Sequence, residues 1–336
     1  MALGLGWVIA RGEDSPLGLG LLLAEPLLWM GLALAFLRAL TRRRWLVATA
    51  SASGLMAVAV GLRTHAAPIA VDLGLEGPTP TLRSCASHAS APAGPLRLVS
   101  WNTEGALVDA MPALLELDAQ IYVLQELDWQ ALAELEHQAI TRAPEQDTGS
   151  LFVPAVGDVG SGVLVTDGWF GVCGAEQTEI WVQELPAQGD RSALSALSFP
   201  TVEGVGMLPL ITFHADRPRG LGEALDWPGT LAGTSAQLAR TAAALEEPGV
   251  VVVGDSNSHG TFRNSRARMR GGGLAWVGGG ASWPARLGPL PALPIYQVDR
   301  AWAGAGWRVA RVQTLRLSGS AHLALVVDLI PSGVSG

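Results

Sequence analysis

The sequence of 336 residues predicts a layered α/β domain that follows an apolar N-terminal segment. Two observations support this prediction. From residue 96 onward, short apolar strand patterns are interspersed with helical stretches, and several of the strands end in a polar side chain. Two long apolar runs lie before residue 63, and the whole protein has 49% hydrophobic residues and a mean hydropathy of +0.31, which is high for a soluble protein.

Two apolar runs at the N-terminus predict a membrane anchor over residues 1–62. Residues 17–40 are broken only by one Glu-Pro pair and one Arg, and they reach across a hydrocarbon layer of ~30 Å. Residues 45–62 form a second, shorter run, and an arginine cluster at 42–44 between the runs favours a cytoplasmic connection. The prediction is a multi-pass cell-membrane protein with a transmembrane helical hairpin and an extracytoplasmic C-terminal domain. Alternatively, one run is a buried helix of a soluble protein.

Residues 63–95 are rich in Ala, Pro and Ser without a sustained period, which indicates a linker. It would tether the domain, residues 96–336, close to the bilayer. The linker contains Cys85 and the domain contains Cys173. Outside the cytoplasm these two cysteines can form a disulfide, although Cys173 can equally be a small buried side chain.

Apolar patterns predict the elements of the domain in chain order. The strands expected to carry polar residues at their ends are 96–102, 121–126, 208–214, 250–253 and 295–299. Further strands are expected at 162–166, 180–183, 193–199, 307–317 and 323–330, and helices at 111–117, 127–140 and 233–245.

Polar side chains recur where these strands end, and such groups tend to converge on one rim of a sheet. Each also has a purely structural explanation. Glu126 can begin a helix, His214 can bond to the backbone of a loop, and Asp299 can pair with Arg300. The candidates are Asn102, Glu126, His214, Asp255, Asn257, Asp299 and His322, the last in a loop before the final strand.

This ordered set resembles the endonuclease/exonuclease/phosphatase superfamily, which has the DNase I-like fold. The resemblance covers roughly residues 96–330 and implies a four-layer α/β/β/α sandwich. The segment 281–285 is similar to a bacterial subgroup in which a membrane segment precedes the domain. The matching motifs are Trp101-Asn102, Leu124–Glu126, His214–Pro218, Gly254–Asn257, Val298-Asp299 and Ser320–His322.

The resemblance implies a metal site. Glu126 would be the principal ligand, helped by Asn102, and Mg²⁺ (or Mn²⁺) is the cation that carboxylate and amide oxygens prefer. One departure weakens this site. Where the family has Ser-Asp-His, this chain has Ala321 between Ser320 and His322, and the loss of an anionic oxygen lowers the affinity for a cation.

The resemblance also implies catalytic roles. Asp255 would orient or deprotonate the attacking water, and Asn257 would fix its position. His322 would face the scissile phosphate, with its tautomer set by Asp299. His214 would donate to a phosphate oxygen and stabilise developing charge.

The charge of the domain limits its substrates. From residue 96 onward the chain has 15 Arg, no Lys and 25 Asp plus Glu, a formal charge of −10. It therefore lacks the broad positive surface that binds duplex nucleic acid. One local exception contains Arg263, Arg266, Arg268 and Arg270. Within this cluster, Arg263 and Arg266 are the predicted substrate-binding residues, unless the segment is simply a solvated loop beside glycine runs.

Together these features predict a membrane-anchored, metal-dependent phosphoesterase that hydrolyses a lipid-linked or membrane-proximal phosphate ester outside the cytoplasm. The first alternative is an extracytoplasmic nuclease. The second is a catalytically degenerate binding module of the same fold, which the alanine at position 321 would favour.

Overall fold

The structure is a computed structural model that describes residues 95–144, 148–154, 159–166, 180–184, 193–200, 207–215, 221–245, 248–257, 263–287, 290–294 and 296–332. The predicted membrane spans, nearly all of the linker, and both Cys85 and Cys173 lie outside these ranges. Among the helices within them, none combines the length and the apolar character that a membrane crossing requires.

The chain divides into two compact units. The first comprises residues 1–72, 218–233 and 261–267, of which the structure describes the beginnings of helices α7 (Leu221–Ala244) and α8 (Arg263–Gly271). The second comprises residues 73–217, 234–260 and 268–336, and it contains every described strand.

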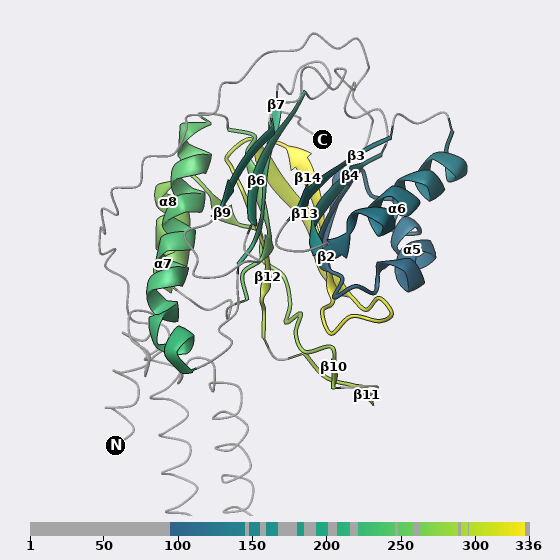
Figure 1. Cartoon of the computed structure of the whole chain (residues 1–336). Helices are drawn as coiled ribbons and strands as arrows, with labels where there is room; N and C mark the ends of the chain where they lie inside the picture. Colours follow the sequence, from purple (N-terminus) through teal and green to yellow (C-terminus); the bar gives the residue numbers. More distant parts are fainter. Residues whose placement is uncertain are drawn as a thin grey trace, which may run out of the picture. The chain divides into compact units, whose positions relative to one another are not determined.

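The first sheet of the second unit has the order β13-β14-β1-β2-β4-β3. Its strands β1 and β2 are parallel, because helix α5 (Leu107–Leu115) provides the crossover between them. A second helix, α6 (Trp129–Arg142), begins where the Asp128 carboxylate accepts from Ala131 N at 2.7 Å. The strands are β1 (Leu96–Asn102), β2 (Ile121–Asp128), β3 (Gly149–Pro154), β4 (Val159–Val165), β13 (Trp307–Leu315) and β14 (Ala324–Pro331) (Figure 1).

The second sheet has the order β5-β6-β7-β8-β12-β9. Strands β7 and β8 are parallel and are connected through α7, whereas β12 is antiparallel to β8. A short separate hairpin consists of β10 (Arg286–Leu287) and β11 (Leu290–Pro291). The strands of the sheet are β5 (Ile180–Glu184), β6 (Ala193–Pro200), β7 (Met207–His214), β8 (Val251–Asp255), β9 (Ala275–Trp276) and β12 (Asp299–Ala303).

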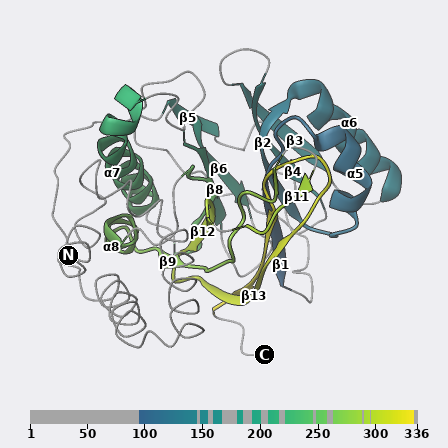
Figure 2. The same cartoon turned by 90° about the horizontal axis from the view of Figure 1, so that it is seen from below.

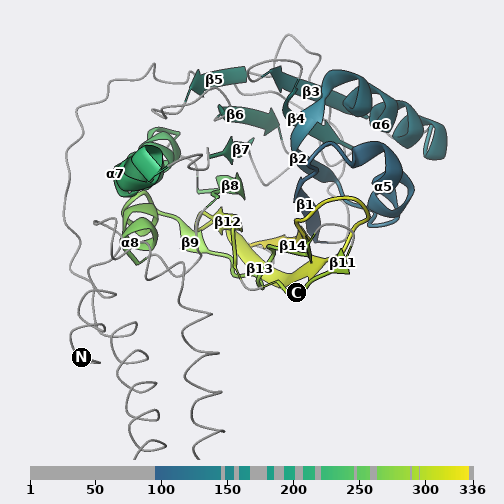
Figure 3. The same ribbon diagram turned by 60° about the horizontal axis from the view of Figure 1, so that its bottom comes forward.

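Alternation along the strands builds the core between the two sheets. Leu98 and Val123 of the first sheet belong to one buried cluster with Leu210 and Val253 of the second. Because successive side chains point to opposite faces, the two sheets can pack face to face through these residues. Strands β8 and β12 accordingly lie opposite β1 in two different views (Figures 2 and 3).

The opposite face of each sheet is covered by helices. Trp101 and Tyr122 of the first sheet pack with residues of α5 and α6, and Figure 3 shows these two helices together on that side. Phe213 and Val252 of the second sheet pack with Leu238 near the C-terminal end of α7. The second unit therefore has the α/β/β/α layer order that the resemblance implied.

Four expectations about individual elements need correction. The strand expected at 295–299 instead begins at Asp299 and runs to Ala303, because it pairs antiparallel with β8 and leaves the rim rather than approaching it. The helices expected at 111–117 and 233–245 begin earlier, at Leu107 and Leu221. The segment considered as a solvated loop forms helix α8, residues 263–271.

We expect Gly254→Ala to destabilise the protein, because a Cβ at this position would collide with the carbonyl oxygen of Phe213 on the adjacent strand β7. A backbone cannot move aside as a flexible side chain can, so the cost should reach ~3 kcal/mol. That corresponds to a fall in Tm of roughly 10 °C in a thermal scan. Gly271→Ala is the control, since a Cβ there meets nothing within 4 Å. Equal Tm values for the two variants would contradict the packing described for β8.

Candidate active site

The predicted polar residues meet where both sheets present strand ends. His214 and Asp255 end the parallel strands β7 and β8 and are paired in register. Asp299 begins β12 directly opposite Asp255. Asn102 ends β1, and Glu126 lies near the end of the neighbouring strand β2. Parallel strands align their C-terminal ends, and the antiparallel β12 brings its first residue to the same edge.

Asp255 is the centre of this group. Its side chain is fully buried, and its Oδ2 accepts a hydrogen bond from Asn102 Nδ2 at 3.0 Å. The same oxygen lies 3.8 Å from His214 Nε2 and 3.9 Å from His322 Nδ1. Its other oxygen, Oδ1, accepts from Asn257 N at 2.7 Å. One carboxylate therefore connects groups from the two sheets and from two loops.

Glu126 reaches the site from an irregular position in β2. The register of β2 with β4 shifts between Gln125 and Leu127, and Glu126 has the positive φ of 53° that a bulge can impose. Its Oε1 accepts from Asn102 Nδ2 at 3.1 Å and lies 3.5 Å from His214 Nε2. A strand without the bulge would turn this side chain towards one face of the sheet, so the irregularity aims the carboxylate at the site.

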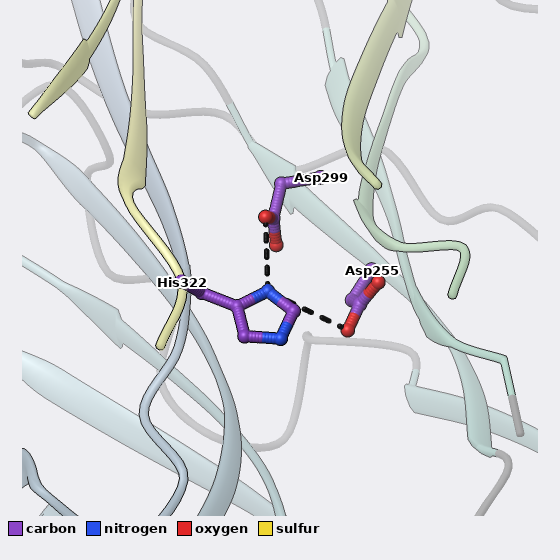
Figure 4. Close-up of side chains that lie close together, drawn as sticks. All are labelled: Asp255, Asp299 and His322. Atoms are coloured by element: carbon purple, nitrogen blue, oxygen red, sulfur yellow. Dashed lines mark hydrogen bonds and ion pairs between the residues drawn. The ribbon is translucent and has the colours of Figure 1, made fainter. Parts of the chain in front are cut away.

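His322 and Asp299 form a buried pair. His322 Nδ1 lies 3.1 Å from Asp299 Oδ2, and Figure 4 shows the imidazole directed at both Asp299 and Asp255. Trp101 Nε1 donates to the carbonyl oxygen of His322 at 3.2 Å, and Ser282 Oγ accepts from Asp299 N at 3.2 Å. Both partners are thus held by other parts of the fold. Because Nδ1 of His322 contacts Asp299, the other ring nitrogen, Nε2, is the one that can bind a ligand.

The electrostatics of the pair favour a charged imidazole. Burial lowers the pKa of His322, but the charges of Asp299 and Asp255 and the hydrogen bond with Asp299 outweigh it and raise the pKa to about 9. Burial raises the pKa of Asp299, and the charge of His322 opposes that shift. We assign the proton to His322, because several carboxylates surround it and each favours the imidazolium.

Asn257 and His214 occupy the other side of Asp255. Asn257 has a φ of 46°, and its Nδ2 donates to Ala215 O at 2.6 Å. The same nitrogen lies 3.2 Å from His214 Nε2. This contact fixes the edge of the imidazole that faces Glu126 and Asp255.

Sequence reasoning missed Glu104, which lies between Asn102 and the loop of His322. Its Oε2 accepts from Ala321 N at 2.6 Å and lies 3.4 Å from Ser320 Oγ. The sequence did offer one signal for Glu104: it lies two residues after Asn102, just as Asn257 lies two residues after Asp255. The loop contact itself joins residues 217 positions apart and has no local signature.

The remaining predicted residues are two arginines of helix α8. Arg263 and Arg266 belong to the part of α8 that is in the first unit. Their proposed contact with substrate stays a prediction.

Comparison with known proteins identifies the family. Residues 99–322 match the sequence profile of the Endonuclease/Exonuclease/phosphatase family, which covers well over half of the chain. The chain belongs to this family. Its members are phosphoesterases and nucleases. No curated protein matches the sequence.

Solved structures agree with the fold. An endonuclease/exonuclease/phosphatase family protein from Bacteroides thetaiotaomicron aligns with a TM-score of 0.53 and 14% identity, over 70% of this chain and 97% of that one. A mannosyl-6-phosphatase from the same organism aligns with a TM-score of 0.53 and 14% identity, over 70% of this chain and 99% of that one. Truncated Caenorhabditis elegans TDP2 aligns with a TM-score of 0.53 and 16% identity, over 70% of this chain and 97% of that one. At these identities the likeness concerns the fold.

Enzymes of this family typically use divalent metals, and the donor set of this member fits such an ion. Glu126 Oε1 and Asp255 Oδ2 both accept from the single Nδ2 of Asn102, so two carboxylate oxygens already converge. Ring nitrogens of His214 and His322 lie within 4 Å of these carboxylates. Converging carboxylates suit a hard divalent cation, which would relieve their mutual repulsion.

Two geometric details refine this metal assignment. Asp255, Asp299 and His322 also place potential ligand atoms within 4.8 Å of one another. His322 Nδ1 already pairs with Asp299 Oδ2 at 3.1 Å, so we assign that trio to proton and charge control. Asn102 turns Nδ2 to the carboxylates while its Oδ1 accepts from Glu104 N at 3.1 Å. Its role as a metal ligand stays a prediction.

In metal-free protein, we expect the His322 ring to titrate at about pH 9. Asp299→Asn should lower this value towards 6.5, because the substitution removes a charge that favours the imidazolium. A raised folded pKa stabilises the fold fully below the unfolded pKa near 6.5, and this stabilisation is lost as the pH rises to 9. NMR titration in EDTA measures the ring directly, with the resonance assigned by its loss in His322→Gln. A wild-type ring that titrates near 6.5 would contradict the pairing.

Proposed function

We propose that this protein is a membrane-anchored, divalent-metal-dependent phosphoesterase that hydrolyses a lipid-linked or membrane-proximal phosphate ester outside the cytoplasm. The observation that carries the proposal is the convergence of Glu126, Asp255 and His322 at one rim of the fold. Hydrolysis of a phosphate ester needs a carboxylate that can bind a metal, a second carboxylate that can accept a proton from water, and a charged group such as an imidazolium that can stabilise the phosphate.

Each residue has a role that follows from its contacts. Mg²⁺ or Mn²⁺ bound by Glu126 would supply positive charge to the phosphate oxygens, and Asn102 would help to bind it through Oδ1, the atom that also accepts from Glu104 N. Asp255 orients the attacking water and accepts its proton, and its bond from Asn257 N fixes the carboxylate for that task. Asn102 aligns the two carboxylates by donating to both of them.

The two histidines act on the phosphate. Charged His322 donates from Nε2 to a phosphate oxygen, while Asp299 holds Nδ1 and keeps the ring in place. His214 approaches from β7 and donates to a second oxygen as negative charge develops. The predicted contacts of Arg263 and Arg266 with substrate would add to this positive field.

The membrane part of the proposal is supported by the two apolar runs at the N-terminus, residues 17–40 and 45–62. The charge of −10 from residue 96 onward disfavours a long phosphate polymer as substrate.

The first test is metal-dependent hydrolysis by the full chain. We expect turnover of a phosphate ester with Mg²⁺ and none with EDTA, and Glu126→Gln should lower kcat/KM at least ~100-fold by removing a charged ligand. Glu134→Gln is the matched control, because Glu134 lies on the surface of α6 and its partner Gln138 can bond to either side chain. The substrates are phosphomonoesters, including mannose 6-phosphate, lipid-linked phosphates and single- and double-stranded DNA.

The other functions give different results in the same assay. Salt-sensitive activity confined to DNA would make the protein a nuclease. No turnover of any substrate by the wild type or by Ala321→Asp would favour the degenerate binding module.

The second test concerns the anchor. We expect the full chain to float with phospholipid vesicles at high salt, and a chain that begins at residue 96 to remain in the unbound fraction. High salt screens the surface charges, so retention would report insertion rather than electrostatic adsorption. Release of the full chain by salt alone would contradict a transmembrane anchor.

A further inference from the structure

Glu104 lies in a turn that the structure holds in a strained conformation. Its φ is 47°, a left-handed value that is uncommon for a residue with a side chain, and Gly105 follows with a φ of 76°. The turn is fixed at two points, because Asn102 Oδ1 accepts from Glu104 N and Glu126 O accepts from Gly105 N at 3.0 Å. A constrained turn of this kind aims the side chain in one direction.

The Glu104 carboxylate is directed at the loop that carries His322. Its Oε2 accepts from Ala321 N at 2.6 Å, a short distance typical of a charge-assisted hydrogen bond. The same oxygen lies 3.4 Å from Ser320 Oγ, which donates to Asn102 O at 2.7 Å and accepts from His322 N at 2.9 Å. Glu104 and Ser320 thus tie this loop to the end of β1.

The loop is also held from its other side. Ala321 O accepts from Ala285 N at 2.5 Å, and Leu323 N donates to Ser282 O at 2.8 Å. Ser282 is the residue whose Oγ accepts from Asp299 N. The backbone of Ala321 is therefore held on both sides: its N–H donates to Glu104, and its C=O accepts from Ala285, in the segment that fixes Asp299.

We propose that Glu104 is a positioning residue, which holds the loop 318–322 by the Ala321 amide and thereby keeps His322 in register with Asp299. The kinetic consequence rests on the proposed function, whereas the structural consequence does not. The charge of Glu104 acts in the same direction as the geometry, because it is among the charges that raise the pKa of His322.

Two substitutions of Glu104 distinguish the effect of its hydrogen bond from the effect of its side-chain volume. Glu104→Ala removes the acceptor for the Ala321 N–H, and we expect kcat to fall ~10–100-fold, as it does when a reacting group is misplaced by about an ångström. KM should change less, by at most about 3-fold, because a positioning residue acts through the loop and not on the substrate itself. Glu104→Gln keeps an oxygen acceptor and should retain kcat to within about 5-fold. Glu134→Ala and Glu134→Gln are the surface controls.

Hydrogen exchange of the full chain provides a readout that needs no activity. In Glu104→Ala we expect faster exchange in peptides that cover 318–323, with no change in peptides from α6. Unchanged exchange in this loop would overturn the proposal, as would a Glu104→Ala variant whose only defect is a higher Mg²⁺ requirement. An inactive wild type whose loop still exchanges faster in Glu104→Ala would refute the proposed function while leaving the positioning role supported.

Discussion

The buried carboxylate of Asp255 is the interaction on which the active site depends. A carboxylate removed from water is costly unless hydrogen-bond donors replace its hydration. Asp255 obtains one donor from Asn102 in the opposite sheet and one from the backbone of Asn257, and it lies near two histidines. These groups reach it only because the two sheets pack face to face. The apolar core between the sheets and the polar rim are therefore parts of one arrangement.

Backbone strain is concentrated at this rim. Of the four described non-glycine residues with a positive φ, three are Glu104, Glu126 and Asn257, and all three contact the site. Each such conformation costs ~1–3 kcal/mol, and it persists because the surrounding strands and hydrogen bonds determine it. The bulge at Glu126 and the turns after β1 and β8 direct these side chains to positions that regular strands would not reach.

The balance of charge at the rim favours both the protonated His322 and the cation that we propose for the site. Glu104, Glu126, Asp255 and Asp299 bring four acidic side chains to one rim of a domain that is already acidic. An anionic phosphate approaching these groups alone would be repelled. The proposed divalent metal near Glu126, together with the imidazolium of His322, would reverse the local sign. Such a cationic centre in an acidic surface would suit a small ester better than an extended polyanion.

Local sequence determined the strands and most of the polar residues that meet at the rim. Alternation and β-branched runs identified β1, β2, β7 and β8, because a period of two residues depends only on neighbouring side chains. Tertiary structure decided the rest. Asp299 reaches the rim because antiparallel pairing with Asp255 starts its strand there, and Glu104 gains its role from a partner 217 residues away. Such choices depend on register and on turn geometry between distant segments, which no local pattern encodes.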